Sequence, residues 1–475
     1  MNKKPFYLTT TLPYVNADPH IGHALEFVQA DALARYARLM GREVFFNTGT
    51  DEHGQKIFEA AGKAGQDVHA YVDHFASEFK KLDHALSLSN DAFIRTTDPG
   101  HYRAAQEIWR RCDAAGDIYK KKYKGLYCVG DEMFLRESDL VDGTCPNHPN
   151  MTPVILEEEN YFFRFSAYQQ KLEEYLANTG SIVPEWRREE ALAFVRGGLE
   201  DFSISREKSR LAWGVPVPGD DAQVMYVWFD ALTNYVSTLG WPDGENFEKF
   251  WAKGEVMQIA GKDQIRFQSL IWQAMLMSAG VKNTDRVLYH GFITSGAQKM
   301  SKSLGNVISP YELVERYGTD ATRYLLLRHV HPFEDSDITW DKLDEWYNAD
   351  LANGLGNLAS RVLTLAQAHL TEGTRPEAIG FAVEYTDAVE KYELNKMLDY
   401  IWGRVGALDA RITAEAPFKL VKIDPEAAKK IIFELTQELY AIVRMLNPIM
   451  PATNKILKEA IMANKKPENL FPRKE

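Results

Sequence analysis

The chain has 475 residues, 45% of them hydrophobic and 26% charged, with a formal net charge of −12. This composition excludes a disordered or fibrous protein, the length predicts roughly two to four domains, and the acidity disfavours a generally basic nucleic-acid-binding protein. The three cysteines are too few for a disulfide framework. The sequence has no signal-peptide segment, and no apolar run approaches the roughly 20 residues that a membrane span needs. We therefore expect a cytoplasmic protein with no membrane contact.

The first predicted elements are a strand and a helix joined by a short loop. Phe6 to Thr11 is rich in aromatic and β-branched residues, which favours a strand. Asp18 and Pro19 suit the N-cap and the first position of a helix. Apolar residues then recur at helical spacing from Ile21 to Met40, and Gly41 ends the pattern.

The opening turn of this helix carries two histidines. His20 and His23 are three positions apart and therefore share a face. Free N–H groups and the positive end of the helix dipole make such a turn an anion site, and imidazoles add donors there. Gly22 lets a ligand approach the backbone. On local grounds the turn is either a phosphate site or a corner with two surface histidines.

The next segments continue a strand–helix alternation. Glu43 to Asn47 is a predicted buried strand that leads into Asp51, and a short strand near Phe93 precedes a helix at Pro99 to Ala115. This alternation predicts a doubly wound α/β domain with a parallel sheet. Ligands bind at the carboxyl ends of such strands, where Asp51 is expected.

From residue 118 the chain becomes turn-rich and β-like. Cys128, Asp131, Cys145 and His148 form a C-x2-D…C-x2-H pattern. Two closely spaced ligand pairs are what a tetrahedral zinc knuckle requires, and a carboxylate can ligate zinc. The segment is therefore either a structural zinc site or a knuckle that packing alone maintains.

Two further segments have aromatic and glycine patterns of interest. Trp228, Ala231 and Tyr235 recur at helical spacing, so they line either the core or a pocket. Val256 to Gln268 predicts a strand, a glycine turn and the start of a helix. The next segment, Lys299 to Ser303, has two lysines three apart among serines, a donor-rich strip suited to clamping phosphates, although it is not a Walker A loop.

The last third of the chain is helical by its periodicity. Ser309 to Val330 is a predicted helix–glycine–helix unit, and from about Trp346 onward the pattern predicts a bundle. The bundle alone is compatible with a structural, a dimerising or an RNA-binding role.

Two motifs carry a resemblance to a known family. His20-Ile21-Gly22-His23 matches the HIGH signature of class I aminoacyl-tRNA synthetases, and Lys299 to Ser303 matches their KMSKS loop. The segments TLPYVNADPHIGH and YVWFDALTNYVS resemble the methionyl-tRNA synthetase family, and the resemblance covers essentially the whole chain. It implies a Rossmann-like catalytic domain with an inserted α+β connective domain and a C-terminal all-α bundle.

The resemblance divides the chain into five segments. They are the first catalytic half (1–117), the connective insertion with the knuckle (118–222), the second catalytic half (223–295), the KMSKS loop with the stem-contact region (296–345) and the helical anticodon-binding domain (346–475).

The implied reaction is ATP-dependent ligation of L-methionine to its tRNA through methionyl-adenylate, with Mg²⁺ bridging the pyrophosphate. The implied partners are L-methionine, ATP and the acceptor end and CAU anticodon of tRNA(Met), and no obligatory protein partner is evident. Catalytic roles fall on His20, His23, Lys299 and Lys302. ATP contacts are implied for these residues and for Gly22, Gly261, Asp263 and Ser301.

The remaining site residues are also implied by the resemblance. The methionine pocket comprises Leu12, Tyr14, Asp51, Trp228, Ala231, Leu232, Tyr235, Gln264, Phe267 and Gln268. The anticodon contacts are Asn357, Arg361 and Phe418, and the metal ligands are Cys128, Asp131, Cys145 and His148. The chain departs from the family at Asp131, usually Cys, at Phe418, usually Trp, and at Gln264 and Gln268, usually an aliphatic residue and His.

Three other functions fit the sequence less completely. A class I synthetase for another aliphatic or sulfur amino acid would account for Gln264 and Gln268. An adenylating enzyme that does not use tRNA would keep both motifs. A non-catalytic RNA-binding paralogue is disfavoured by the intact HIGH and KMSKS motifs.

Overall fold

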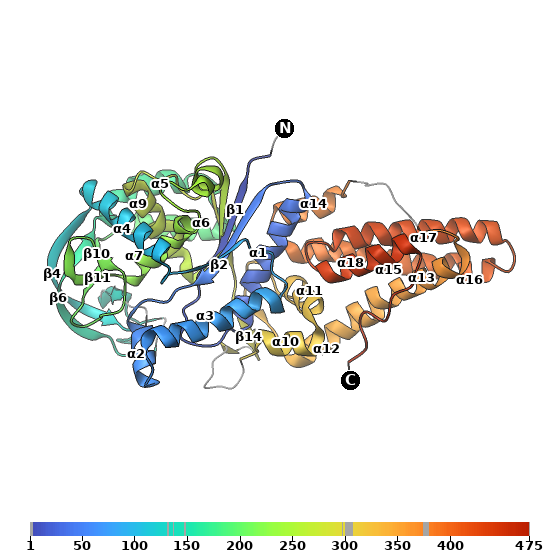
Figure 1. The fold of residues 1–475 in the computed structure, drawn as a ribbon, viewed down its shortest axis with the longest axis horizontal. Coiled ribbons are helices and arrows are strands. Elements are labelled where there is room, and N and C mark those ends of the chain that lie inside the picture. Colours follow the sequence, from blue (N-terminus) through green and yellow to red (C-terminus); the bar gives the residue numbers. More distant parts are fainter. Residues whose placement is uncertain are drawn as a thin grey trace. The chain divides into compact units, whose positions relative to one another are not determined.

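The computed structural model describes residues 3–130, 133–135, 137–146, 149–296, 298–299, 307–373 and 380–474 (Figure 1). The chain forms two compact units. The first comprises Met1–Pro19, Gly41–Asp83 and Ser89–His290, and the second comprises His20–Met40, His84–Leu88 and Gly291–Glu475. The division of the chain into five functional segments stays a prediction, because the structure separates only two compact units.

A six-stranded parallel sheet forms the centre of the first unit. Its order is β3 (Ala92–Arg95), β2 (Val44–Thr50), β1 (Phe6–Thr10), β12 (Glu255–Gly261), β13 (Arg286–His290) and β7 (Ile182–Val183). Every neighbouring pair is parallel. The strand order reverses direction between β1 and β12, which makes the sheet doubly wound. The predicted α/β class is confirmed.

The central strands β2, β1 and β12 of this sheet are almost wholly buried. All five residues of β1 are buried, as expected for a parallel sheet with two covered faces. One core cluster joins Tyr7, Val256 and Tyr289 from the strands to Trp109 and Trp272 from helices. The helices of this unit are α2 (Gln55–Lys63), most of α3 (Val68–Ala85), α4 (Pro99–Ala114), α5 (Gln169–Leu176), α6 (Glu185–Arg196), α7 (Val227–Ala231), α8 (Asn234–Ser237) and α9 (Trp272–Ser278).

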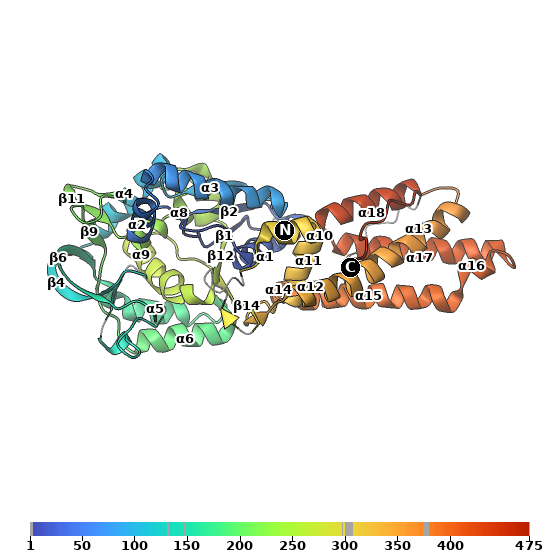
Figure 2. The same ribbon diagram turned by 90° about the horizontal axis from the view of Figure 1, so that it is seen from below.

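The predicted insertion contains two antiparallel sheets. One has the order β5 (Met133–Leu135), β4 (Ile118–Cys128), β6 (Val154–Phe163), β8 (Phe202–Ser203), and the other has β10 (Pro216–Val217), β11 (Asp220–Met225), β9 (Ser205–Glu207). Figure 2 shows α5 and α6 side by side in the same part of the chain. The lysines of β4 lie opposite the glutamates of β6, with Lys122 paired to Glu159 and Lys124 to Glu157, so this stretch is charge-balanced rather than a basic patch.

The second unit is mostly helical, as predicted for the C-terminal region. In Figure 1, α13, α15 and α17 run side by side. Its helices are α1 (Ile21–Leu39), α10 (Pro310–Tyr317), α11 (Thr319–His329), α12 (Trp340–Trp346), a π-helical segment (Tyr347–Gly356), α13 (Asn357–His369), α14 (Val383–Glu390), α15 (Leu394–Glu415), α16 (Pro417–Leu420), α17 (Pro425–Met445) and α18 (Pro451–Ala463). A small sheet has the order β15 (Gln298–Lys299), β14 (Ile293–Ser295), β16 (Ser336–Asp337). None of the helices in the described part of the chain is long and apolar enough to span a bilayer.

A buried ion pair ties α1 to the rest of the second unit. Arg323 of α11 and Asp31 of α1 are both fully buried, and Arg323 Nη2 lies 2.7 Å from Asp31 Oδ2. The guanidinium also donates to the carbonyl oxygens of Ile449 at 2.7 Å, Leu86 at 3.0 Å and Pro448 at 2.9 Å. Its donors therefore reach three segments of this unit: α1, the segment at Leu86 and the adjacent residues Pro448 and Ile449.

Asp350 gives the second unit a pH-dependent contribution to stability. His329 Nε2 lies 2.9 Å and Arg328 Nη1 3.2 Å from its carboxylate. Burial alone would raise the pKa of Asp350, but the hydrogen bond from His329 and the charge of Arg328 outweigh it and hold this pKa below its usual value.

We expect Asp350→Asn to reduce the free energy of unfolding by about 1.5–3 kcal/mol at pH 7. Because the folded pKa is depressed, the contribution is complete above the unfolded pKa of about 3.9 and is lost as the pH falls through the folded pKa. Urea unfolding between pH 7 and pH 2 measures both effects. Parallel curves for the variant and the unchanged protein across this range would contradict the assignment.

Candidate functional site

The predicted methionine-pocket residues follow the carboxyl ends of three neighbouring strands. Leu12 and Tyr14 come after β1, Asp51 after β2, and Phe267 and Gln268 after β12. The reversal of strand order lies between β1 and β12. Ligands of doubly wound sheets bind in the crevice at this switch point. The fold therefore brings these residues together at the position where the sequence predicts a site.

The loops after β1 and β2 are joined by backbone hydrogen bonds. Asp51 N–H donates to the carbonyl of Pro13 at 2.9 Å, and Val15 N–H donates to the carbonyl of Asp51 at 3.2 Å. Tyr14, between them, forms an isolated bridge with Asp51. Asp51 is buried. This ladder of bonds holds the backbone of Asp51 next to that of Tyr14.

An aromatic wall lies next to this ladder. The rings of Trp228 and Phe267 stack with centroids 3.9 Å apart and planes 14° apart, and Tyr14 meets Trp228 edge-on at 6.0 Å. Trp228 and Ala231 lie in α7, whereas Tyr235 lies in α8. The expectation of one continuous helical face is wrong in this respect, because a turn at residues 232–233 separates two short helices.

The two glutamines that depart from the family pattern have separate partners. Gln268 is buried, and its amide nitrogen donates to the Tyr235 hydroxyl and, at 3.4 Å, to Thr11 Oγ1. Its amide therefore links the α8 hydroxyl of Tyr235 to Thr11, just after β1. Gln264 Nε2 donates to Asp263 Oδ2 at 2.7 Å. The second glutamine thus holds the predicted ribose-binding carboxylate.

The HIGH-motif histidines cap their own helix in the second unit. The helix begins at Ile21 with His20 as N-cap, so the prediction of Asp18 as N-cap is wrong. His20 Nδ1 accepts from Gly22 N–H at 3.1 Å, and His23 Nδ1 accepts from His20 N–H at 3.2 Å. These reciprocal bonds take the place of the usual Ser or Asp cap.

This cap determines the tautomer of both histidines. A neutral imidazole that accepts at Nδ1 carries its proton on Nε2, so each ring is an N–H donor at Nε2. The two rings stack with centroids 3.7 Å apart. A side chain at Gly22 would place its Cβ 2.9 Å from His20 Cε1. Glycine is therefore required for this arrangement of rings.

The KMSKS segment is described only in part. Lys299 is the last residue of β15, and its backbone pairs with Thr294 of β14. Its side chain, and Ser301 and Lys302 entirely, lie outside the described residues.

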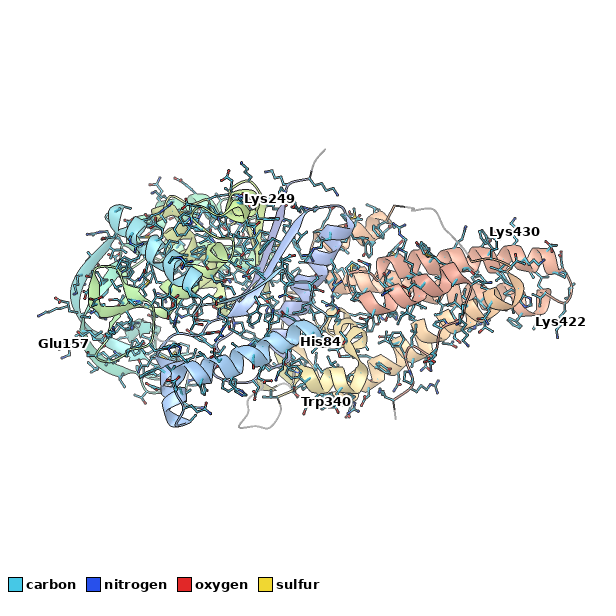
Figure 3. All side chains as sticks on the ribbon, in the orientation of Figure 1. His84, Glu157, Lys249, Trp340, Lys422 and Lys430 are labelled. Carbon is cyan, nitrogen blue, oxygen red and sulfur yellow. The ribbon has the colours of Figure 1, made fainter. Side chains whose placement is uncertain are left out.

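The predicted anticodon residues lie on α13 and α16 of the bundle. Asn357 begins α13 and is exposed, and Arg361, one turn later, pairs with Asp409 of α15. Phe418 in α16 is 46% exposed. Lys422 lies at the end of the bundle just beyond α16 (Figure 3). Exposed aromatic rings stack on unpaired bases in proteins that bind single-stranded nucleic acid, and the anticodon role of Phe418 stays a prediction.

The predicted zinc ligands are only half described. Cys128 and Cys145 are both buried and belong to one small cluster with Leu135. Asp131 and His148 lie outside the described residues, and the described residues alone contain no group of three potential metal ligands. The metal site therefore stays a prediction.

Sequence reasoning missed the polar cluster behind the aromatic wall. Glu52 is buried and accepts two hydrogen bonds from Arg95, at 2.6 Å and 2.9 Å. His53 and Asp230 are buried as well, 2.6 Å apart. The sequence signal for these residues is the presence of polar side chains within buried segments. These are Glu52 and His53 in DEH and Asp230 in WFDAL.

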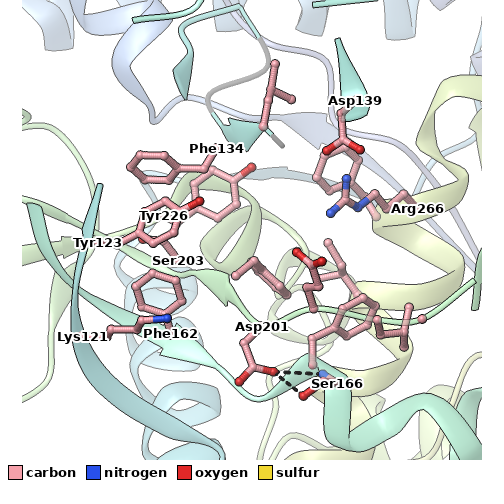
Figure 4. Close-up of a pocket in the computed structure, with 18 of the residues that line it drawn as sticks. Lys121, Tyr123, Phe134, Asp139, Phe162, Ser166, Asp201, Ser203, Tyr226 and Arg266 are labelled. Carbon is pink, nitrogen blue, oxygen red and sulfur yellow. Dashed lines mark hydrogen bonds between the residues drawn. The ribbon is translucent and has the colours of Figure 1, made fainter. Parts of the chain in front are cut away.

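A pocket of about 440 Å³ borders the aromatic wall on the insertion side (Figure 4). It is lined by aromatic rings and by Arg206 and Arg266, and Phe267 forms part of its boundary. Asp201 at its rim accepts hydrogen bonds from Ser166 N–H at 3.1 Å and Ser166 Oγ at 2.6 Å. The pocket and the aromatic wall thus share one ring.

Residues 6–152 and 148–363 match the sequence profile of the family described as tRNA synthetases class I (M), and the chain belongs to this family. A methionine–tRNA ligase of Brucella melitensis is 41% identical over 98% of this chain and 93% of that protein. One of Mycobacterium bovis is 42% identical over 96% of this chain and 91% of that protein. The structure of Mycobacterium tuberculosis methionyl-tRNA synthetase in complex with methionyl-adenylate has a TM-score of 0.90 and 38% identity, covering 99% of this chain and 100% of that one. The family expected from the HIGH and KMSKS motifs is confirmed.

Proposed function

We propose that this protein is a methionine–tRNA ligase, which activates L-methionine with ATP and transfers it to tRNA. The observation that carries the proposal is the stacked Trp228–Phe267 pair with Tyr14 at the switch point of the sheet. Thioether sulfur makes favourable contacts with aromatic rings. A wall of three rings near Asp51, an acidic residue, therefore suits a substrate with a thioether at one end and an ammonium at the other.

Different pocket residues would contact different parts of the bound methionine. The Asp51 carboxylate would hold the ammonium, and the aromatic wall would contact the side chain. Gln268 and Tyr235 would present a polar edge to the sulfur. The apolar remainder of the pocket consists of the buried residues Leu12, Ala231 and Leu232.

ATP would be held by donors that neutralise phosphate charge. His20 and His23 would donate from Nε2, and Lys299 and Lys302, with Ser301, would bind the other side of the triphosphate. Gly261 and Asp263 would contact the nucleoside. Mg²⁺, when bound, would neutralise negative charge on the leaving pyrophosphate. Positioning and charge stabilisation are sufficient for this chemistry, so no protein nucleophile is needed.

The reaction would proceed through two nucleophilic displacements. A methionine carboxylate oxygen attacks the α-phosphorus of ATP, and the bond to pyrophosphate breaks. A ribose hydroxyl of the terminal adenosine of tRNA then attacks the carbonyl carbon of methionyl-adenylate, loses its proton, and AMP leaves. Charging of a tRNA that has a CAU anticodon with labelled methionine tests the whole sequence. Formation of the adenylate without any charging would instead support the tRNA-independent alternative.

Phe418 is expected to contribute to tRNA binding through base stacking. Phe418→Ala should raise KM for tRNA by roughly 5- to 150-fold, because stacking of one base on an aromatic ring is worth about 1–3 kcal/mol. Methionine-dependent pyrophosphate exchange should be unchanged. Phe433→Ala is the matched control, since Phe433 of α17 is similarly exposed, 43% against 46%. Equal effects of both substitutions would contradict an anticodon role for Phe418.

A structural Zn²⁺ ion is part of the proposal. Two buried thiols in one cluster fit a zinc site, and Asp131 and His148 would complete the set. The ion would cross-link the turns of the insertion. We expect about one zinc per chain in the purified protein by metal analysis and loss of zinc in Cys145→Ser. Full activity in a zinc-free preparation of the unchanged protein would contradict this.

A further inference from the structure

Three buried side chains that none of the proposed substrate contacts includes form one hydrogen-bonded cluster. Asp230 Oδ2 lies 2.6 Å from His53 Nδ1, and Asp230 Oδ1 lies 2.6 Å from His101 Nε2. The exposed fractions of Asp230, His53 and His101 are 0%, 1% and 0%. We call these three residues the Asp230 cluster.

Both histidines of the Asp230 cluster have a second partner. His53 Nε2 lies 2.9 Å from the Tyr102 hydroxyl, and His101 Nδ1 lies 2.9 Å from Ser237 Oγ. The carboxylate accepts one N–H from each ring, and the opposite nitrogen of each ring lies within hydrogen-bond distance of a hydroxyl. Every ring nitrogen is thereby used, and the orientation of both rings is fixed.

Asp230 is held as a carboxylate. Burial alone would raise the pKa of Asp230, but the charge and hydrogen bonds of His53 and His101 lower it below its usual value. A buried carboxylate with two short hydrogen bonds has little freedom to move. Breaking either bond would leave a buried polar group without a hydrogen-bond partner, which costs free energy.

The Asp230 cluster joins the elements that carry the methionine pocket. Asp230 lies in α7 between Trp228 and Ala231, and His53 follows Asp51 by two residues. His101 belongs to α4, and its partner Ser237 belongs to α8, which also carries Tyr235. One carboxylate therefore cross-links the loop that carries the ammonium ligand and the helix that carries the aromatic wall.

We propose that the Asp230 cluster is a positioning device that sets the distance between Asp51 and the Trp228 ring, and thereby the fit of methionine. The inference rests on the proposed function. Buried charged clusters stabilise a fold weakly compared with apolar packing of the same volume, but they fix geometry by their directional bonds. A binding site needs its groups placed to within about 0.5 Å. Two hydrogen bonds to one carboxylate restrain the connected segments in this way.

The test compares Asp230→Asn with the unchanged protein in pyrophosphate exchange. The asparagine keeps the shape of the side chain but can accept from only one histidine at full strength. We expect KM for methionine to rise at least about tenfold, which corresponds to about 1.4 kcal/mol, while KM for ATP stays within about twofold. Asp117→Asn is the control, because the Asp117 carboxylate also accepts from two side chains, Tyr168 and Ser278, but joins no pocket element. It should change neither KM.

His101→Gln is a second, milder variant that removes one of the two imidazole partners and leaves Asp51 and His53 in place. It should raise KM for methionine about threefold to tenfold. A fall in melting temperature with both KM values unchanged, or an equal rise of both, would overturn the positioning role. If the unchanged protein does not exchange with methionine, the proposed function fails, and the same comparison is made with the amino acid that it does activate.

Discussion

Arg323→Leu is expected to lower the free energy of unfolding by about 3–5 kcal/mol, because it removes the only fully buried one of the two arginines that pair with the buried carboxylate of Asp31. The substitution also removes the donors to the carbonyl groups of Ile449, Leu86 and Pro448. Arg35 remains 2.7 Å from Asp31 but is partly exposed. Chemical denaturation followed by circular dichroism measures the loss.

The double variant Arg323→Leu/Asp31→Leu separates charge burial from packing. Removing both charges should cost less than the sum of the two single substitutions, since no uncompensated ion stays in the core. Lys429→Ala is the surface control, because its pair with Glu426 is exposed and should contribute at most about 1 kcal/mol. Strict additivity in the double variant would contradict a coupled buried pair.

His23→Ala is expected to reduce kcat for methionine-dependent pyrophosphate exchange by about 10²- to 10³-fold, the effect of removing one donor to a developing oxyanion. The reason is the tautomer that the cap fixes: His23 Nδ1 accepts from His20 N–H, so Nε2–H is the donor to phosphate. KM for methionine should change little, because the histidine would act on the phosphate and not on the amino acid.

Steady-state exchange kinetics with varied methionine and varied ATP provide this measurement. His74→Ala is the control, since His74 is an exposed histidine of α3 with no proposed role. An unchanged kcat in His23→Ala, or a loss confined to KM for methionine, would contradict the role in adenylate formation.

Local patterns predicted the elements well. The strand at the N-terminus, the helix that Gly41 ends and the helix–glycine–helix unit around Gly318 are present with bounds close to those expected. These elements have strong periodicity and clear end signals, Gly41 and Gly318 both having positive φ. Leu12, Asp51 and Phe267 lie at neighbouring strand ends because they follow adjacent strands of a sheet whose class the alternation predicted, whereas their binding roles stay predictions.

Other features depended on contacts that spacing does not encode. The N-cap at His20 was missed because an imidazole is not among the usual capping side chains. The Asp230 cluster joins three segments far apart in the chain, so the polar residues within DEH and WFDAL do not by themselves show that they meet.

The most direct test of the account is amino-acid-dependent pyrophosphate exchange by the purified protein, with methionine, isoleucine, valine, leucine and cysteine compared at equal concentration. We expect exchange with methionine to be well above exchange with the other four amino acids. Gln268 and Tyr235 would contact the sulfur, and the three aromatic rings of the wall would contact the rest of the side chain. Exchange with one of the other amino acids and none with methionine would contradict it and assign the pocket to that side chain.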